Sequence, residues 1–238
     1  MNLIKPFLLL ILLSGCQITE TLNINQDGTG TIEIYSLRDE NSFMQMGRNH
    51  FASEKFRDTI FIFQDYITKY KDTFVKFSKS DQALFQEHAN VKMHIKTDPV
   101  QMENFNVVSF DFKKLEEIPD LYLSLGLSNS LKENYPVQKR FFTIKYNFDG
   151  TTFKRNVIIT DQEKFDQEKK ESEARKVMFS KYKAMQSYTL KYNFPKDIKT
   201  VSNEKSLISS DKRTLTLEFQ ISDYLQNPES TNLEVVLE

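Results

Sequence analysis

Cys16, the single cysteine of the chain, is the side chain best placed for covalent chemistry. Its thiol directly follows an apolar run that ends in the small residues Ser14 and Gly15. None of the three histidines pairs with a second ligand at the spacing of a metal-binding motif. They are His50, His88 and His94. The sequence therefore predicts no metal site and no cofactor, and its distinctive reactive group is a thiol near the amino terminus.

The residues before Cys16 have the order of a short secretory signal, in which Met1 and Lys5 carry positive charge and residues 6–13 are apolar. The four residues that end this leader resemble the lipobox of bacterial lipoproteins: Leu13, Ser14, Gly15 and Cys16. The resemblance implies cleavage between Gly15 and Cys16. It also implies diacylglycerol on the thiol and an acyl chain such as palmitate on the new amino terminus.

Two other interpretations of the leader are weaker. An uncleaved transmembrane anchor would need ~20 apolar residues, and this segment has roughly eight. A buried free cysteine conflicts with the position of Cys16 at the end of a leader. The diacylglycerol and the amino-terminal acyl group together supply three acyl chains, and stable anchoring to a membrane requires only two membrane-binding signals. We therefore expect a lipid anchor in the bacterial cell envelope. Gln17 after the cysteine favours the outer membrane over the inner membrane, and the leaflet and face stay open.

The charge of the mature chain excludes some partners. Removal of Lys5 with the leader leaves 31 basic against 33 acidic side chains, so no nucleic-acid partner is expected. Acylation of Cys16 leaves no thiol for a disulfide, so the stability of the domain must come from its core. Twenty Phe and ten Tyr, with no Trp, predict a core rich in aromatic area.

Alternation of apolar and polar residues predicts strands with one buried face. The apolar positions of these segments are Leu22 and Ile24; Ile32 and Ile34; Val91, Met93 and Ile95; Val108, Phe110 and Phe112; Phe142, Ile144, Tyr146 and Phe148; Tyr188, Leu190, Tyr192 and Phe194; Leu215, Leu217, Phe219 and Ile221; Leu233, Val235 and Leu237. Asp27-Gly28 and Asp149-Gly150 have the composition of hairpin turns. The pattern predicts an α+β fold, with an antiparallel sheet of hairpins and two or three amphipathic helices on one face.

Three segments have helical features. The first has apolar residues spaced alternately four and three: Phe56, Ile60, Phe63, Ile67, Tyr70, Phe74 and Phe77. This stripe favours packing on the sheet over a coiled coil, whose seam prefers branched aliphatic residues. A second helix is expected to start at Thr160 or Asp161 and to run to about Gln186. A shorter one over 115–127 is interrupted at Pro119, and a loop is expected over 128–138.

The domain organisation follows from these elements. Residues 1–15 form the cleaved signal peptide, and residues 16–238 form the mature, lipid-anchored α+β region. Whether that region contains two subunits of fold meeting near 128–138 stays open. The similar turn sequences at 25–29 and 147–151 are too short to establish a repeat.

Two stretches resemble the LppM-like domain of exported lipoproteins of unknown function. The first extends from Cys16 to Gly30, and the second comprises residues 192–199 followed by 209–214. The resemblance implies helices over an antiparallel sheet and a role at the envelope in which lipid contact is one alternative. It implies no functional residue.

No catalytic residue is predicted, because the chain contains no nucleophile elbow, zinc-protease helix or phosphate-binding loop. The preferred hypothesis is a non-catalytic interaction or accessory module that is held to membrane lipid through Cys16 and binds another envelope protein. The first alternative is a carrier of a lipid or other apolar ligand in a pocket between sheet and helices. The second is an envelope hydrolase with dispersed site residues. The ligand-binding residues and the oligomeric state are not specified by the sequence.

Overall fold

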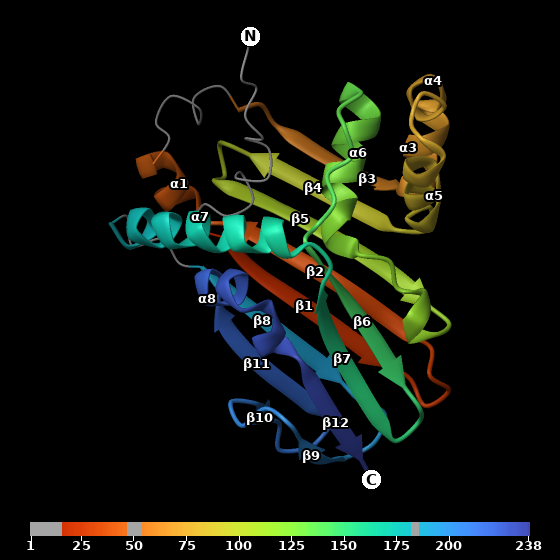
Figure 1. The fold of residues 1–238 in the computed structure, drawn as a ribbon, viewed down its shortest axis with the longest axis vertical. Coiled ribbons are helices and arrows are strands. Elements are labelled where there is room, and N and C mark those ends of the chain that lie inside the picture. The colour runs from red at the N-terminus through yellow and green to blue at the C-terminus, as the bar shows by residue number, and fades with distance from the viewer. Residues whose placement is uncertain (1–15, 47–53, 182–185) are drawn as a thin grey trace.

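The computed structural model describes residues 16–46, 54–181 and 186–238. Within these ranges the chain forms twelve strands and seven α-helices, which confirms the predicted α+β class. The strands make two mostly antiparallel sheets (Figure 1). The leader and His50 lie outside the described residues.

The larger sheet has eight strands. Their spatial order is β10 (Leu207–Ile208), β11 (Thr214–Gln220), β8 (Ser187–Asn193), β1 (Cys16–Ile24), β2 (Gly30–Arg38), β5 (Glu103–Phe112), β4 (Lys92–Asp98) and β3 (Arg57–Ile62). Neighbouring strands are antiparallel except for β1 and β8, which run parallel. Since β8 comes late in the sequence, this sheet joins both halves of the chain.

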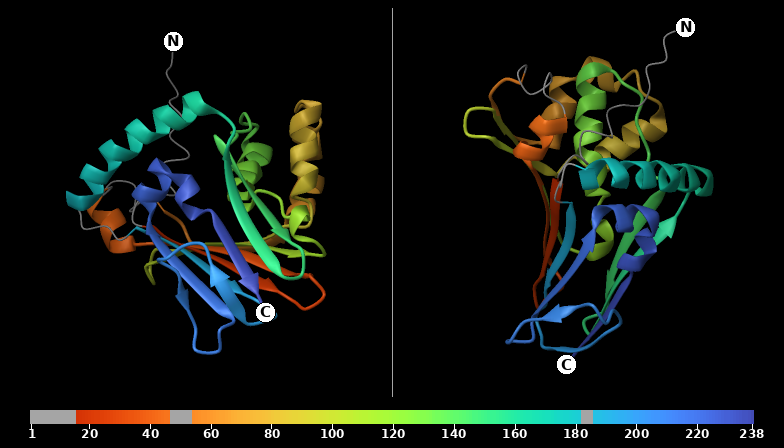
Figure 2. Two further views of the ribbon diagram at one scale, coloured as in Figure 1. Left: turned by 60° about the horizontal axis from the view of Figure 1, so that its bottom comes forward. Right: turned by 90° about the vertical axis from the view of Figure 1, so that its left-hand side faces the viewer.

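The smaller sheet has four strands. Their order is β6 (Phe142–Phe148), β7 (Thr152–Ile159), β12 (Leu233–Leu237) and β9 (Ile198–Val201). The two sheets converge toward the carboxyl terminus and open toward the helices (Figure 2). Aromatic side chains fill the space between them. The ring of Phe153 on β7 lies 5.4 Å from that of Tyr192 on β8, centroid to centroid. The predicted aromatic core is therefore present.

Both predicted Asp-Gly turns are confirmed. They join β1 to β2 and β6 to β7, and their glycines have positive φ angles, 81° at Gly28 and 94° at Gly150. In each turn the aspartate carboxylate accepts a hydrogen bond from the backbone N–H of the threonine two residues on, at 3.0 Å and 2.9 Å respectively. Glycine supplies the left-handed conformation, and the carboxylate fixes the loop.

Helices flank the open end of the two sheets (Figure 1). They are α1 (Glu40–Met46), α3 (Phe63–Lys69), α4 (Lys71–Phe74), α5 (Lys79–Glu87), α6 (Ser124–Glu133), α7 (Gln162–Lys181) and α8 (Ile221–Gln226), with 3₁₀ turns η2 (Leu115–Glu117), η3 (Leu121–Leu123) and η4 (Pro228–Thr231). The helix predicted from Thr160 or Asp161 to about Gln186 is confirmed over 162–181 as α7; residues 182–185 lie outside the described residues, and Gln186 is not helical. Helix α7 packs on α8, where Lys176 Nζ lies 3.2 Å from Asp223 Oδ1.

The prediction of one helix over Phe56–Phe77 is wrong in part. Residues 57–62 form β3, an edge strand paired with β4, and the helical path begins only at Phe63. The strand exposes every second residue, including Ile60 and Ile62. The apolar residues of this segment fit both the helical period and the alternating period of a strand. Pairing with β4 decides in favour of the strand, which the β-branched residues of the segment also favour.

The prediction for 115–138 also needs correction. Instead of one interrupted helix and a loop, the chain forms the turns η2 and η3 and then helix α6, which continues to Glu133. Leu127 and Leu131, one turn apart, are buried in the core. The helix ends at Asn134, which has the left-handed conformation that asparagine tolerates, with φ 56°. Burial of the leucines therefore outweighs the polar composition of the segment.

Candidate functional site

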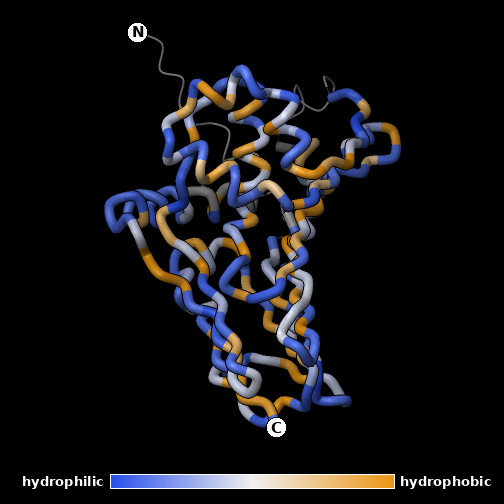
Figure 3. Tube along the Cα trace, turned by 90° about the vertical axis from the view of Figure 1, so that its right-hand side faces the viewer, coloured by the Kyte–Doolittle hydropathy of each residue, from blue (hydrophilic) through white to orange (hydrophobic). Residues whose placement is uncertain are grey.

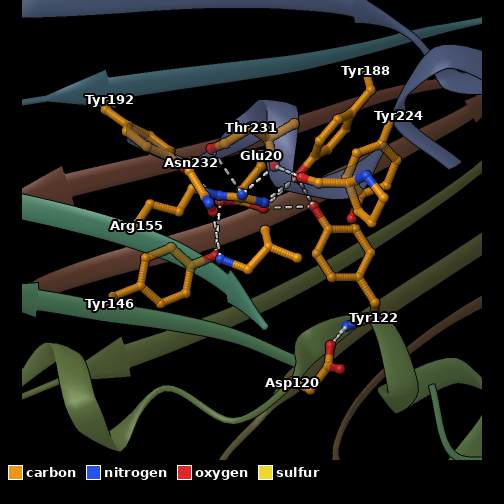
Figure 4. Close-up of polar contacts among 12 residues, drawn as sticks. Glu20, Asp120, Tyr122, Tyr146, Arg155, Tyr188, Tyr192, Tyr224, Thr231 and Asn232 are labelled. Carbon is orange, nitrogen blue, oxygen red and sulfur yellow. Dashed lines mark hydrogen bonds and ion pairs between the residues drawn. The ribbon is translucent and has the colours of Figure 1, made fainter. Parts of the chain in front are cut away.

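A charged side chain, Glu20, lies in the core between the two sheets (Figure 4). It shares the inward face of β1 with the buried Leu22 and Ile24. Its counter-ion is Arg155 on β7, whose Nε lies 3.5 Å from Glu20 Oε1. Both side chains are 0% exposed. Because β1 and β7 belong to different sheets, this ion pair connects the two layers of the fold.

Four tyrosine hydroxyls donate hydrogen bonds to the Glu20 carboxylate. Oε1 accepts from Tyr192 at 2.5 Å and Tyr146 at 2.8 Å. Oε2 accepts from Tyr122 at 2.6 Å and Tyr188 at 2.8 Å. The tyrosines come from η3, β6 and β8, so three separate segments meet at one carboxylate. A carboxylate has about four acceptor positions, and the four hydroxyls match that number.

Arg155 is also bonded on its other side. Its Nη1 donates to the carbonyl oxygen of Thr231 at 3.1 Å and to the hydroxyl of the same residue at 2.5 Å. Its Nη2 donates to the Tyr188 hydroxyl at 2.9 Å. The guanidinium therefore joins β7 to the η4 turn and to the tyrosines around Glu20.

The electrostatics of this cluster keep both partners charged. Burial by itself would raise the pKa of Glu20, but Arg155 and the tyrosine hydroxyls hold it below its ordinary value. Burial also opposes the charge of Arg155, yet the surrounding hydroxyls and Glu20 raise its pKa well above the usual range. Burial and the carboxylate raise the pKa of all four tyrosines. The cluster therefore contains an ionised carboxylate, a guanidinium and neutral phenols.

The geometry gives this cluster a structural role. A general acid or base must reach a proton on its substrate, directly or through one water. Glu20 and Arg155 have no exposed surface, and their polar atoms bond to other side chains or to the backbone. The arrangement can fix the register of the two sheets, and it offers no open position for a reacting group.

A second arginine–carboxylate pair lies closer to the surface. Arg140 Nη1 lies 2.7 Å from Asp120 Oδ1, and the two side chains are 15% and 17% exposed. The guanidinium carbon of Arg140 stacks 3.9 Å from the centre of the Phe142 ring. The buried ring of His88 lies between backbone carbonyl oxygens, with Nδ1 2.9 Å from that of Leu84 and Nε2 3.1 Å from that of Asp120.

This second pair borders a pocket of about 600 Å³. Helix α5 forms one wall, the η2–η3 segment another, and the edge strand β6 with the residues before it the third. Part of the lining is apolar: Leu84, Leu115, Ile118, Leu123, Phe142 and Ile144. Lys139, Arg140 and Lys145 add positive charge, and Glu87, Glu116 and Asp120 add negative charge. The volume is within the range of small-molecule sites.

Of the residues singled out by the sequence, His88 lies behind the pocket wall, bonded to Leu84 and Asp120, whereas Cys16 and His94 lie apart from the pocket and from the Glu20 cluster. Cys16 is the first residue of β1, at the end of the larger sheet. Gly15 lies outside the described residues. His94 is on β4, where its Nε2 lies 2.8 Å from Asp58 Oδ1. Among the described residues, no group of three His, Cys, Asp or Glu side chains is placed to hold a metal ion.

Sequence reasoning missed both Glu20 and Arg155. A signal was present, since each charge occupies an inward position of an alternating strand. Arg155 lies between Phe153 and Val157, both of which are buried. A charged residue at such a position is rare unless it has a partner. The pattern indicates that a partner exists, and only the fold indicates which residue it is.

The fold and the site define an α+β domain whose two sheets enclose a charged core beside an open pocket. Comparison of the sequence with models of protein families and with curated proteins gives no match. Among solved structures, the chain is similar to the folded domain of LppM from Mycobacterium tuberculosis, determined by NMR. The similarity covers 95% of this chain and 91% of that chain, with a TM-score of 0.35 and 8% identity. Within the described residues, no helix is long and apolar enough to cross a membrane.

Proposed function

We propose that this protein is an envelope lipoprotein, anchored through acylated Cys16, that acts by binding rather than catalysis. In this role it is an accessory module for another envelope protein. The lipobox-like run before Cys16 supports the anchor. The outer membrane is the proposed location, on the basis of Gln17 after the cysteine.

One observation carries the non-catalytic part of this proposal: the closed state of the Glu20 cluster. Glu20 and Arg155 form the dense charged centre of the domain, and both are fully buried and bonded on several sides. Acid–base catalysis uses groups with shifted pKa values that face a cleft. Here the shifted groups hold two sheets together, which favours a rigid scaffold with its binding surfaces on the outside.

The anchor is tested by growing cells with a clickable palmitate analogue and analysing the purified chain by mass spectrometry. We expect the label on a chain that begins at Cys16 and its absence from the Cys16→Ser variant. The Gln17→Ser variant is a matched control, because it makes a similar change next to the cysteine and leaves the thiol in place. An unlabelled chain that keeps residues 1–15 would contradict the proposed anchor.

The accessory role is tested by cross-linking in intact cells followed by mass spectrometry. We expect one abundant envelope protein to be captured by the anchored chain and lost from the mislocalised Cys16→Ser variant. Capture of the same proteins by both variants, or of none by the anchored chain, would contradict an accessory role.

The pocket beside β6 favours a second candidate function, carriage of an amphiphilic ligand. Its apolar lining could hold an acyl or aromatic group, while Lys139 and Lys145 could contact an anionic head. The test is native mass spectrometry of the purified protein, followed by extraction of any retained ligand. We expect Ile144→Trp, which fills the pocket, to lose that ligand. Ile158→Trp on the neighbouring strand β7, outside the pocket lining, should keep it.

A further inference from the structure

The hairpin between β4 and β5 carries exposed apolar residues at its tip. Val100 is 92% exposed and Met102 39%. The turn is well defined, because Asp98 Oδ1 accepts hydrogen bonds from the backbone N–H groups of Val100 and Gln101, each at 3.0 Å. The hairpin projects from the body of the protein as a yellow-green loop in the right-hand view of Figure 2, and Figure 3 shows the molecule from the opposite side. A fixed turn therefore holds two apolar side chains in solvent.

A third exposed apolar residue, Phe56, lies beside this hairpin. It directly precedes β3, whose first residue Arg57 pairs with Thr97 near the end of β4. The phenyl ring is 66% exposed. Single exposed apolar side chains are common on protein surfaces, but a group of them marks an interaction site. We call Phe56, Val100 and Met102 together the apolar tip.

An arginine clamp places the apolar tip near the lipid attachment site. Arg38 is the residue of β2 that pairs with Cys16. Its guanidinium binds Glu40 at the start of α1, with Nε 2.6 Å from Oε1, and also Glu54, with Nη2 2.6 Å from Oε2. Glu54 is two residues before Phe56. One buried arginine thus ties the segment that carries Phe56 to the strand next to Cys16.

The strand register gives the level of the apolar tip relative to Cys16. Gln17, Leu37 and Phe105 lie side by side on β1, β2 and β5. Counted from this row, Cys16 is one residue toward the end of the sheet, and the hairpin turn is three or more. At ~3.4 Å per residue, the apolar tip extends past Cys16 by about 3 Å at Phe56, about 7 Å at Met102 and about 10 Å at Val100. It lies two to four strands away, or about 10–20 Å across the sheet.

No free linker separates the lipid attachment site from the folded domain, because β1 begins at Cys16 itself. Acyl chains on Cys16 would enter the bilayer at the end of the sheet. Any part of that end that reaches past Cys16 must then meet the headgroups. Amphipathic elements that bind at the interface bury apolar side chains about 5–10 Å deep, which is comparable with the reach of the apolar tip. Lys55, exposed beside Phe56, suits an anionic surface.

We propose that the apolar tip enters the lipid surface that holds acylated Cys16 and gives the domain a fixed orientation on its membrane. The inference rests on the proposed anchor at Cys16. The apolar tip contacts the lipid surface itself; it does not bind a ligand of the pocket or a protein. With one contact at the anchor and a second at the apolar tip, the domain could not rotate freely about its attachment.

The test uses the acylated mature protein, residues 16–238, reconstituted into vesicles of phosphatidylethanolamine and phosphatidylglycerol. Acylation consumes the thiol of Cys16, so an introduced cysteine is the only one that a nitrobenzoxadiazole dye can label. Val100→Cys reports on the apolar tip. Gln26→Cys is the matched control, because Gln26 is an exposed turn residue at the opposite end of the same sheet. For each label, the fluorescence quenching by iodide, which reports exposure to water, and by spin-labelled lipid, which reports contact with the bilayer, is measured.

For chains that float with the vesicles, we expect several-fold weaker iodide quenching at position 100 than at position 26, and quenching by spin-labelled lipid only at position 100. Equal access of iodide to both positions would overturn the inference and leave the anchor intact. A chain that does not float would overturn the anchor and the inference together. Protection of position 100 in cells but not on vesicles would assign the apolar tip to a protein partner and overturn the lipid assignment.

Discussion

The two arginine–carboxylate pairs of this domain have the same chemistry in different surroundings. Arg155 and Glu20 are sealed between the sheets, and four tyrosine hydroxyls complete the shell of the carboxylate. Arg140 and Asp120 are 15% and 17% exposed and border the pocket. Water can therefore reach the second pair and cannot reach the first.

This difference separates architecture from binding. A buried pair that loses one partner leaves a charge without compensation, so the pair is expected to govern stability. A pair at a pocket wall can exchange its partner for water or for a ligand group at lower cost. The position of each pair, rather than its residue types, therefore assigns its role. The predictions that follow measure this contrast, beginning with the largest expected effect.

Replacing Arg155 by Met should destabilise the protein most. Methionine replaces the apolar part of the arginine side chain but leaves Glu20 and the hydroxyl of Thr231 without their cationic partner. Removal of one partner of a buried pair costs about 3–5 kcal/mol in the free energy of unfolding. Urea unfolding followed by circular dichroism measures it. The double variant Glu20→Leu, Arg155→Met should recover part of the loss, and a single variant as stable as the parent would contradict a structural role for the pair.

The pH dependence of stability should show the contribution of Glu20. Since the pKa of Glu20 is lower in the folded state than its ordinary value of 4.5, the ionised group stabilises the fold above that pH. This contribution is lost as the pH falls through the folded pKa. The free energy of unfolding of the parent and of Glu20→Gln should therefore differ most near neutral pH and converge in acid. A constant difference from about pH 7 to 3 would contradict the lowered pKa.

Much of the fold could be predicted from the sequence because its strands have one wet face. The alternation in Tyr188, Leu190 and Tyr192 identifies β8 without any knowledge of its neighbours. It fails at β3, where apolar residues fit two periods and the pairing with β4 decides. It also cannot show that β8 runs parallel to β1, because pairing between distant segments leaves no local pattern.

The site could be predicted far less well. Glu20 and Arg155 are 135 residues apart in sequence, and neither belongs to a motif. Their inward positions indicate that each needs a partner. The four tyrosines that bond to Glu20 look like ordinary aromatic core residues in the sequence, since a phenol packs like a phenyl ring until its hydroxyl is considered. The number of aromatic residues was therefore predictable, and the polar use of four of them was not.

Removing one hydroxyl from the shell of Glu20 should have a smaller effect than removing Arg155. In Tyr192→Phe the ring is kept, and one hydrogen bond to a charged group is lost, a change worth about 1.5–3 kcal/mol. Tyr35→Phe is the matched control, because Tyr35 lies on the opposite face of the larger sheet and is partly exposed. Urea unfolding of the two variants measures the contrast. Equal losses would mean that the Glu20 shell adds nothing beyond ring packing.

Arg140→Met should have the smallest effect on stability. Met keeps the contact with the ring of Phe142, and water can solvate the Asp120 carboxylate that loses its partner. We expect a loss of about 1–2 kcal/mol in the free energy of unfolding, well below that of Arg155→Met. If the pocket binds an anionic amphiphile, the same variant should weaken retention of that ligand in native mass spectrometry, whereas Lys154→Met, an exposed position on β7 outside the pocket lining, should not. Equal destabilisation by Arg140→Met and Arg155→Met would remove the distinction between a sealed pair and an open one, and would make the pocket wall part of the same structural core.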